Sequence, residues 1–320
     1  MTTRHMVTFE SPRSPGPEPH ANAETVLVTG AGSGMGLECA LHLAASGYRV
    51  FASVLDEAEA EALGAEARAR GLALRALLMD VTRSEEIRAA VDTMMAEAGR
   101  IDALVQFAGM GLRGFFEDLT LDEVRRVYEV NVFGTMAVTQ AVLPWMRAAR
   151  RGRIVITTSA AGRMGSMSIS GYASSKFAVE GFAECLGQEV APFGIHVSLL
   201  EPGLVFTEHF TRNRNRAARA VDSSSPYYAW FCQHEKMVDE LLRRNRFTKV
   251  DVARMVHRIL TSRRPRLRYV VGAKAKLILG LRRHLPGELF ERIYWGIVRR
   301  LVTSPRRPAR GLSGLAESDR

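Results

Sequence analysis

The 320-residue chain has few of the residues that build disulfide frameworks or metal centres. Its three cysteines, Cys39, Cys185 and Cys232, are scattered, and an odd count argues against a disulfide framework. The eight histidines are dispersed, without His, Cys or carboxylate groups at ligand spacing. We therefore expect a protein of a reducing compartment whose chemistry needs no metal.

Long apolar runs are also missing. No run reaches the ~18 residues that a transmembrane helix needs, and residues 1–23 lack the apolar core of a signal peptide. These first residues are instead mixed Pro, Ser and charged residues, which is typical of a disordered leader. We expect the protein on the cytoplasmic side.

A strand, a glycine turn and a helix follow one another near the start of the chain. The β-branched run Thr25–Thr29 leads into Gly30-Ala-Gly-Ser-Gly-Met-Gly36 and then into the helix-like residues 37–45. Glycines let the backbone turn tightly and let a pyrophosphate approach, while the helix N-terminus supplies unpaired N–H groups. This order predicts a phosphate-binding site.

Apolar strand candidates recur along the chain with helical patterns between them. They are residues 25–29, 49–53, 74–79, 101–107, 153–159, 196–201 and 268–271. This alternation predicts an α/β fold, a doubly wound Rossmann-type parallel sheet of about seven strands with helices on both faces. We expect one such domain over residues 24–272, because 47% hydrophobic content can fill one large core.

The residues that follow the predicted strand ends indicate where the active site lies. Ligands bind beyond the carboxyl ends of the strands in such sheets, and the glycine loop, Asp80, Gly109, Ser159 and Pro202 all follow strand ends. These five candidates should meet in one crevice.

Tyr172 and Lys176 suggest proton transfer. Their i, i+4 spacing puts the phenol and the ammonium on one face of a helix expected over residues 171–190. A nearby ammonium should lower the phenol pKa from about 10, and Ser159 would hold the substrate oxygen. The alternative is that Tyr172 packs, Lys176 is a solvated charge and Ser159 only ends a strand.

These residues together carry a family resemblance. The motifs are Thr29–Gly36 as Thr-Gly-x-x-x-Gly-x-Gly, Asp80-Val81, Asn131, the Ser159, Tyr172 and Lys176 set, and Pro202-Gly203 followed by Thr207. Over roughly residues 24–210 the chain resembles the short-chain dehydrogenase/reductase family. The tail is more weakly similar to the branch that contains hydroxysteroid and retinol dehydrogenases.

The resemblance implies a nicotinamide cofactor and a role for each motif. Gly30, Gly34 and Gly36 would carry the pyrophosphate turn, Asp80 and Val81 the adenine, and Thr207 the nicotinamide amide. Lys176 would hold the ribose hydroxyls. The full cofactor set is Gly30, Ser33, Gly34, Met35, Gly36, Asp80, Val81, Ala108, Gly109, Tyr172, Lys176, Pro202, Gly203, Val205 and Thr207.

Asp80 and Asn131 could instead have purely structural roles. Asp80 would otherwise be a helix N-terminal charge ahead of Ser84. Asn131, in an otherwise helical pattern, would by resemblance form a water-binding kink that passes protons to Lys176; otherwise its amide bonds its own helix. Asn131, Ser159, Tyr172 and Lys176 form the implied catalytic set.

The chain departs from the family pattern in two places. Gln106-Phe107 stands where the family usually has two asparagines, which puts the local geometry in doubt. At the second strand end, Val54 and Leu55 carry no charge and Asp56 comes late. No arginine is near, so we expect NAD rather than NADP, with either open.

The segment 204–240 should cover the substrate. It contains the aromatic residues Phe206, Phe210, Tyr227, Tyr228, Trp230 and Phe231. These rings favour a lipophilic alcohol or ketone of the steroid, retinoid or fatty kind, or they only pack a loop onto the core.

The C-terminal part holds the positive charge. Residues 241–320 contain 21 Lys and Arg against 5 Asp and Glu, whereas the other 240 residues contain 23 against 29. An apolar stripe at helical spacing runs over residues 289–301, so we expect a basic amphipathic helical extension over 273–320 with a disordered end. The stripe docks on the protein or a second subunit, or attaches peripherally to an anionic membrane surface. Nucleic acid is disfavoured, because no reading motif is present.

We therefore expect an enzyme that moves a hydride reversibly between a nicotinamide and a CH–OH carbon, with Tyr172 as acid and base. An isomerase or epimerase on the same fold, or a nicotinamide-sensing protein without turnover, are the alternatives. By resemblance we expect a homodimer or homotetramer.

Overall fold

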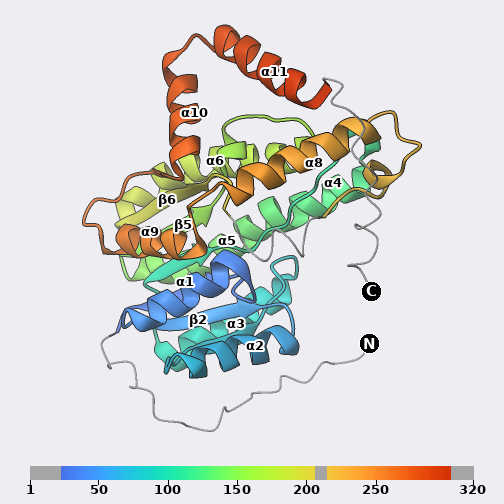
Figure 1. Ribbon diagram of the computed structural model, residues 1–320. Helices are drawn as coiled ribbons and strands as arrows, with labels where there is room; N and C mark the ends of the chain where they lie inside the picture. The colour runs from blue at the N-terminus through green and yellow to red at the C-terminus, as the bar shows by residue number, and fades with distance from the viewer. Residues whose placement is uncertain (1–22, 206–214, 304–320) are drawn as a thin grey trace.

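The computed structural model describes residues 23–205 and 215–303 (Figure 1). Seven parallel strands form one sheet in the order β3-β2-β1-β4-β5-β6-β7. The strands are β1 (Thr25–Thr29), β2 (Arg49–Val54), β3 (Arg75–Leu78), β4 (Ala103–Gln106), β5 (Gly152–Thr157), β6 (Ile195–Pro202) and β7 (Arg268–Val271). Successive strands β1, β2 and β3 are placed in one direction across the sheet and β4 to β7 in the other, so the strand order reverses between β1 and β4, and ligands bind at such a point.

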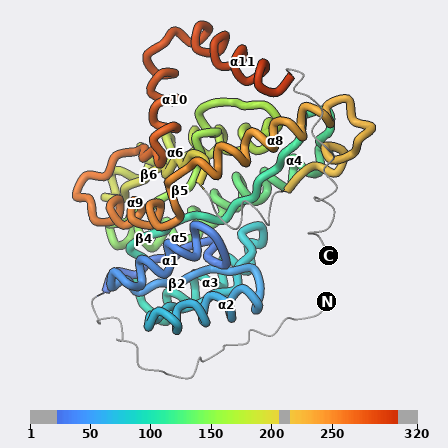
Figure 2. The backbone as a smooth tube through the Cα atoms, in the orientation of Figure 1, coloured from blue at the N-terminus to red at the C-terminus, as the bar shows by residue number. Residues whose placement is uncertain are grey.

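Helices cover both faces of the sheet (Figures 1 and 2). They are α1 (Gly34–Ala45), α2 (Glu57–Ala69), α3 (Ser84–Ala98), α4 (Leu121–Tyr128), α5 (Thr135–Ala148), α6 (Ser170–Val190), α8 (Tyr228–Arg243), α9 (Lys249–Thr261), α10 (Ala273–His284) and α11 (Gly287–Thr303). Strand alternation divides the core: Leu27 packs in the cluster that α3, α5 and α6 cover, whereas Val26 and Val28 pack in the cluster that α1 and α9 cover.

The predicted fold class is confirmed. Each of the seven predicted strand ranges overlaps an observed strand, and the helix expected over 171–190 is α6. The Asn131 segment is a π-helical turn, Glu129–Gly134, between α4 and α5. A π-helical turn inside a helix is rare and often marks a functional site.

The predicted C-terminal helical extension is also present. α10 leads away from β7, and α11 turns back alongside α8 (Figure 1). α11 buries Phe290, Val298 and Val302, while Leu289 and Ile293 on its flank stay exposed. Part of the apolar stripe therefore packs on the protein itself. Attachment to a membrane or to a second subunit stays a prediction.

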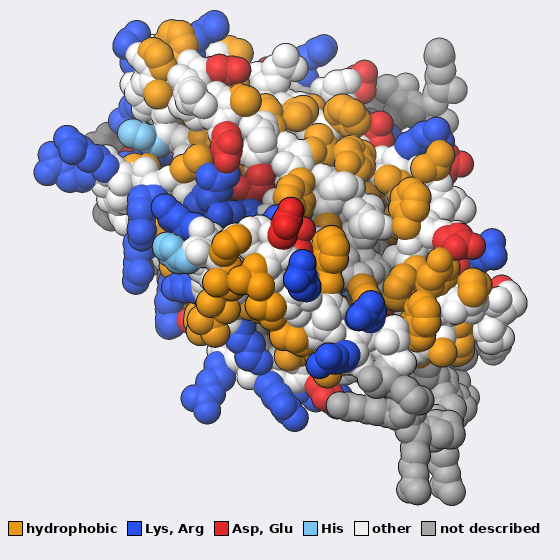
Figure 3. Space-filling view, turned by 90° about the horizontal axis from the view of Figure 1, so that it is seen from above, with side chains coloured by type: hydrophobic (Ala, Val, Ile, Leu, Met, Phe, Trp, Pro, Cys, Tyr) orange, Lys and Arg blue, Asp and Glu red, His pale blue; other side chains and the backbone are white. Residues whose placement is uncertain are grey.

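The surface over α10 and α11 carries both hydrophobic and basic side chains. Figure 3 looks onto this side and shows hydrophobic side chains across it, with Lys and Arg gathered mostly along one edge. In residues 23–205 and 215–303, no helix has the length and apolar character to cross a membrane.

Some predictions fall on residues that lie outside the described part of the chain. These are nearly all of the expected leader at 1–23, the last residues of the extension, and Phe206, Thr207 and Phe210 of the expected cofactor and substrate segment. The rest of the predicted site lies within the described residues.

Candidate active site

The glycine loop after β1 is a closely packed backbone cradle. Gly30 has φ +65°, and a Cβ there would lie 2.7 Å from the main-chain nitrogen of Ala108. A Cβ on Gly36 would lie 2.0 Å from the carbonyl oxygen of Gly30, and Gly34 has φ +59°. These positions require glycine.

The first turn of α1 follows this loop directly. Ser33 is the N-cap residue with extended backbone, and Met35 is half-buried against the cluster beneath α1. The N–H groups of this first turn have no helical acceptor, and the helix dipole places positive potential there. The loop and helix N-terminus therefore fit a pyrophosphate, as the sequence predicts.

The Gln106-Phe107 departure leaves the sheet regular. Thr29 pairs with Gln106 in the parallel register, and the Thr29 hydroxyl accepts the N–H of Ala108 at 3.2 Å. The Gln106 amide donates to the Thr139 hydroxyl of α5 at 2.8 Å, and this bond keeps the buried amide satisfied. The sheet therefore keeps its regular parallel register at this departure.

Asn131 is fully engaged by its neighbours. Its Oδ1 accepts the N–H of Met110 at 2.8 Å, and its Nδ2 donates to the Met110 carbonyl at 2.9 Å and to the Ser175 hydroxyl at 3.0 Å. The side chain thus joins the π-helical turn to the loop after β4 and to α6. The alternative, an amide that bonds only its own helix, is wrong for the side chain.

Gly109 brings Asn131 and Lys176 together. A Cβ on Gly109 would lie 3.2 Å from the Asn131 Oδ1 and 3.6 Å from the Lys176 Nζ. A side chain at position 109 would crowd the Asn131 amide and contact the Lys176 ammonium. The structure therefore places two members of the predicted catalytic set beside the predicted cofactor residue.

Ser159, Tyr172 and Lys176 meet between β5 and α6. Ser159 lies just past the end of β5, and Tyr172 shares a side-chain hydrogen bond with it. The Lys176 Nζ lies 5.9 Å from the centre of the Tyr172 ring and donates to the Thr157 carbonyl at 3.0 Å. The alternative of a solvated lysine is wrong, because Lys176 is buried.

The pKa values of this pair are governed by burial. Burial raises the pKa of Tyr172, and the Ser159 hydrogen bond opposes that rise. This direction is opposite to the predicted lowering by Lys176, because removal of the phenolate from water outweighs the other effects. Burial also lowers the pKa of Lys176 to about 8, against a smaller opposing effect of Glu180.

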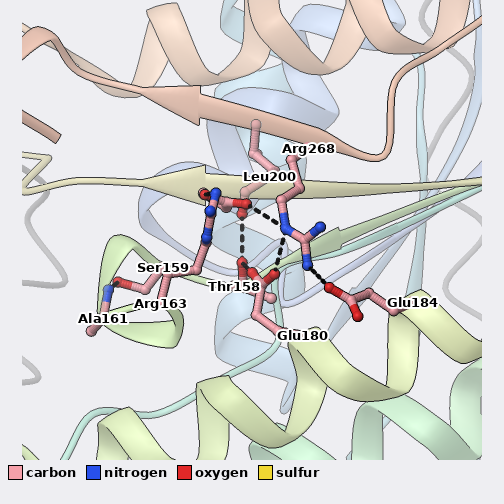
Figure 4. A network of polar contacts seen from close by, with 9 residues as sticks. Thr158, Ser159, Ala161, Arg163, Glu180, Glu184, Leu200 and Arg268 are labelled. Atoms are coloured by element: carbon pink, nitrogen blue, oxygen red, sulfur yellow. Dashed lines mark hydrogen bonds and ion pairs between the residues drawn. The ribbon is translucent and has the colours of Figure 1, made fainter. Parts of the chain in front are cut away.

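A network of hydrogen bonds and ion pairs lies beside the end of β5 (Figure 4). The Thr158 hydroxyl donates to Glu180 at 2.6 Å, and Arg268 of β7 donates to Glu180 at 3.0 Å. Arg268 and Arg163 also pair with the buried Glu201, at 3.2 and 3.4 Å. Strands β5, β6 and β7 are thereby tied to α6 next to Ser159.

Asp80 and Val81 lie where the chain leaves β3. The Asp80 carboxylate accepts the N–H of Thr82 at 2.9 Å and its hydroxyl at 2.8 Å, so it closes a local turn. Asp80 lies three residues before Arg83, the N-cap position of α3, so a charge near the helix N-terminus and a cofactor contact both stay predictions for it. Val81 is buried against Gly134.

The residues after β6 follow the sheet edge. Gly203 donates its N–H to the Val271 carbonyl at 2.9 Å and packs closely on Ala275, and Val205 is buried. Pro202 is the last residue of β6. This places the predicted residues 202–205 at the carboxyl edge of the sheet, on the same edge as Ser159.

The segment between Ser159 and Tyr172 is held by the C-terminal helices. His234 of α8 forms a 2.8 Å hydrogen bond with Ser168, which has φ +59°. Burial lowers the pKa of His234 to about 4, so the imidazole is neutral at pH 7. Tyr294 of α11 donates to the Ser166 hydroxyl at 3.2 Å.

A pocket of about 630 Å³ lies between this segment and α11. Its lining residues are Gly165, Ser166, Met167, Arg292, Tyr294, Trp295, Gly296, Val298 and Arg299. Sequence reasoning did not place α11 at the site, because its apolar stripe resembles any docking or membrane-binding stripe. The pairing of Tyr294 with Ser166 depends on the tertiary fold.

The aromatic residues of 227–231 pack mainly on the protein. Phe231 is buried, and Tyr227 stacks on Phe115 at 4.9 Å between ring centres and donates to Glu117. Trp230 stays 42% exposed at the edge of this group. Tyr227 and Phe231 therefore pack this segment onto the protein, which is the alternative to covering a substrate.

Comparison with known proteins agrees with this geometry. A family model described as short chain dehydrogenase matches residues 24–218. That match covers more than half of the chain and includes the cradle, Asn131 and the Ser159–Lys176 set. The chain belongs to the short-chain dehydrogenase family.

Two relatives of this short-chain dehydrogenase are informative. A 3-ketodihydrosphingosine reductase of Bacteroides thetaiotaomicron is 34% identical over 278 residues, which are 86% of this chain and 98% of that protein. The human 17-beta-hydroxysteroid dehydrogenase type 1 is 34% identical over 264 residues, 80% of each chain. The second relative lies in the branch that the sequence predicts.

A solved structure shares the fold. Actinorhodin polyketide ketoreductase with NADPH superposes with a TM-score of 0.69 at 30% identity, over 80% of this chain and 98% of that one. The short-chain dehydrogenase described here is thus an oxidoreductase with a Rossmann NAD(P)-binding fold.

Proposed function

We propose that this enzyme uses a nicotinamide cofactor to interconvert a hydroxyl and a carbonyl group on a lipophilic substrate of the steroid, retinoid or fatty alcohol and ketone kind. The observation that carries the proposal is the convergence of the Ser159 and Tyr172 hydroxyls with the buried Lys176 between β5 and α6. A hydroxyl pair of this kind can hold and protonate one substrate oxygen.

The cofactor supplies or accepts the hydride when it is bound. Gly30, Gly34 and Gly36 would hold its pyrophosphate at the N-terminus of α1, and Lys176 would hold the nicotinamide ribose. These positions fit because side chains at Gly30 and Gly36 would collide with the cradle backbone.

Tyr172 moves the proton. During reduction its hydroxyl donates a proton to the carbonyl oxygen, and during oxidation the phenolate takes the proton from the alcohol. Ser159 donates a hydrogen bond that positions this oxygen. A phenol with a raised pKa stays protonated at neutral pH, which suits the acid role in reduction.

Lys176 and Asn131 serve the proton supply. The Lys176 pKa of about 8 lies near neutral pH, so the ammonium can lose and regain a proton during turnover. Asn131 holds the π-helical turn beside it through Met110 and Ser175. In this proposal the π-helical turn completes a proton relay that returns a proton to the Tyr172 hydroxyl.

Support for a lipophilic substrate comes from the pocket under α11. Met167, Trp295 and Val298 line it with apolar surface. Its volume of about 630 Å³ is in the range of small-molecule sites. The names of the relatives, a 3-ketodihydrosphingosine reductase and a 17-beta-hydroxysteroid dehydrogenase, also support a lipophilic substrate.

The test is the change in reduced nicotinamide absorbance with NAD and NADP supplied separately. The panel contains steroid, retinoid, long-chain and short polar alcohols and ketones. Turnover of one lipophilic class is the expected result. Turnover confined to short polar alcohols would contradict the substrate proposal, and a product formed without net nicotinamide change would identify an isomerase or epimerase instead.

A further inference from the structure

Two arginines line the pocket between α11 and the segment that joins Ser159 to Tyr172. They are Arg292 and Arg299, which stand seven residues apart on α11 and so lie on one face of the helix. Gly296 lies between them on this face and also lines the pocket, with open space where a Cβ would be. The two guanidinium groups can therefore approach one ligand from its two sides.

The protein does not neutralise this pair of arginines. Both side chains are exposed, and in the part of the chain that the structure describes no carboxylate forms an ion pair with either of them. None of the residues that line the pocket is acidic. By contrast, Arg163 and Arg268 beside the end of β5 both pair with Glu201. The guanidinium donors in the pocket therefore remain available for an anion.

The remaining pocket wall is largely apolar. Met167 lines it from the active-site segment, and Trp295 and Val298 line it from α11. Val298 is buried whereas Trp295 is 61% exposed, so the apolar wall extends from the packed side of α11 to its outer edge. Tyr294 fixes α11 to the segment through its hydrogen bond to Ser166. A ligand that matches this wall and its cations has an apolar body and an anionic group.

The chemistry of arginine favours an acidic ligand over a neutral one. A guanidinium group forms two parallel hydrogen bonds to a carboxylate or a phosphate, and an ionised acceptor makes these bonds stronger than neutral ones. A neutral lipophile would leave both cations without a partner, and a lipophilic amine would be repelled.

The position of the arginines favours a ligand in the pocket over a membrane surface. The exposed apolar side chains of Ile293 and Ile297 do not line the pocket, whereas both arginines do. A helix that lies on a membrane buries its exposed apolar face and keeps its basic groups at the lipid headgroups. Here Arg292 and Arg299 instead share a hollow with Met167 of the active-site segment.

We propose that Arg292 and Arg299 bind an anionic group of the substrate, a carboxylate or a phosphate, so that the substrate is a lipophilic keto or hydroxy acid. The apolar wall holds the hydrocarbon body, which connects the anionic group to the reacting carbon at the Tyr172 hydroxyl. This inference rests on the proposed function, because it names the substrate class of the same site.

Binding of decyl compounds to the full-length protein tests the inference without turnover. Titration calorimetry below the micellar concentrations should show that decanoate or decyl phosphate binds at least about tenfold more tightly than decanol, with decylamine weakest. In the double variant Arg292→Gln/Arg299→Gln the affinity for the bound anion should fall by about tenfold, whereas that for decanol should stay the same. The tighter of the two anions identifies the acidic group.

Matched variants control for the fold and for general charge. Arg300→Gln removes an exposed cation of the same helix that does not line the pocket, so it should change neither affinity. Arg292→Lys keeps the charge without the planar fork and should lose less affinity than Arg292→Gln. Added salt should weaken the binding of the anion but not of decanol. Circular dichroism checks that each variant is folded.

The outcomes separate this inference from the proposed function. Equal affinities of the wild type for decanoate, decyl phosphate and decanol, or an unchanged anion affinity in the folded double variant, would overturn the inference alone. Loss of co-sedimentation with phosphatidylglycerol vesicles in the double variant, without loss of anion binding, would also overturn it and assign the arginines to a membrane surface. Anion binding as expected, with no turnover of any compound in the panel, would support the pocket and contradict the proposed function.

Discussion

Lys176 and Thr157 join the helix that carries the phenol to the strand that leads to Ser159. The Lys176 Nζ donates to the Thr157 carbonyl at 3.0 Å, and both residues lie close to the Tyr172–Ser159 hydrogen bond. Because the lysine is buried, the bond fixes α6 relative to β5 where the substrate oxygen must lie.

Tyr172→Phe should reduce turnover while leaving cofactor binding intact. Loss of a general acid–base group lowers kcat by roughly 10²–10⁴-fold. The measurement is reduced nicotinamide absorbance together with a titration of the cofactor. Tyr48→Phe is the matched control, because Tyr48 lies between α1 and β2 and away from the site. An active Tyr172→Phe variant would refute the assigned role.

Gly36→Ala should damage the cradle. Its Cβ would lie 2.0 Å from a backbone oxygen, so the loop must shift. We expect the free energy of unfolding to fall by about 1–3 kcal/mol and the affinity for the dinucleotide to fall by about tenfold or more. Urea unfolding and fluorescence titration measure the two effects.

Gly181→Ala is the control for that change. Gly181 lies in α6 with open space around it, so alanine should stabilise the protein by about 0.5–1 kcal/mol. Equal behaviour of the two alanine variants would show that the cradle does not need glycine at position 36.

Gly296→Leu should fill the pocket under α11. Gly296 lines the pocket and has open space at the Cβ position, so a side chain can start there without a clash. We expect a raised KM for long or polycyclic substrates and little change for short ones. Gly280→Leu on α10, also with open space, should change neither. Equal loss for short and long substrates would show that the substrate does not use this pocket.

Glu201 should make stability depend on pH. Burial, with repulsion from Glu180, raises its pKa from 4.5 to about 7. Between these values the unfolded chain releases the proton first, so the free energy of unfolding falls as pH rises, by at most about 1.4 kcal/mol per pH unit. Above about pH 7 the loss is complete.

Glu201→Gln removes this titration. Urea unfolding from pH 4.5 to pH 8 should show a flatter pH dependence for the variant than for the wild type. Glu184→Gln, an exposed partner of the same Arg268, should keep the wild-type slope. Parallel curves for wild type and Glu201→Gln would contradict the raised pKa.

Local sequence was enough to predict the sheet and to select Ser159, Tyr172 and Lys176, which the structure brings together. The strands are short apolar runs, of which β1 is buried throughout, and the glycine cradle and the Tyr172–Lys176 pair depend on spacings of a few residues. These features follow from φ/ψ limits, strand burial and helical periodicity. The family resemblance rests on the same local motifs.

Only the tertiary structure decided how distant residues act on one another. The pKa direction of Tyr172 was predicted wrongly, because the spacing to Lys176 is visible in the sequence but the burial of both groups is not. Asn131 bonding to Ser175 and Tyr294 closing over Ser166 join separate elements. Sequence determines each element through local conformational preference, whereas the site forms from contacts that exist only after the sheet has assembled.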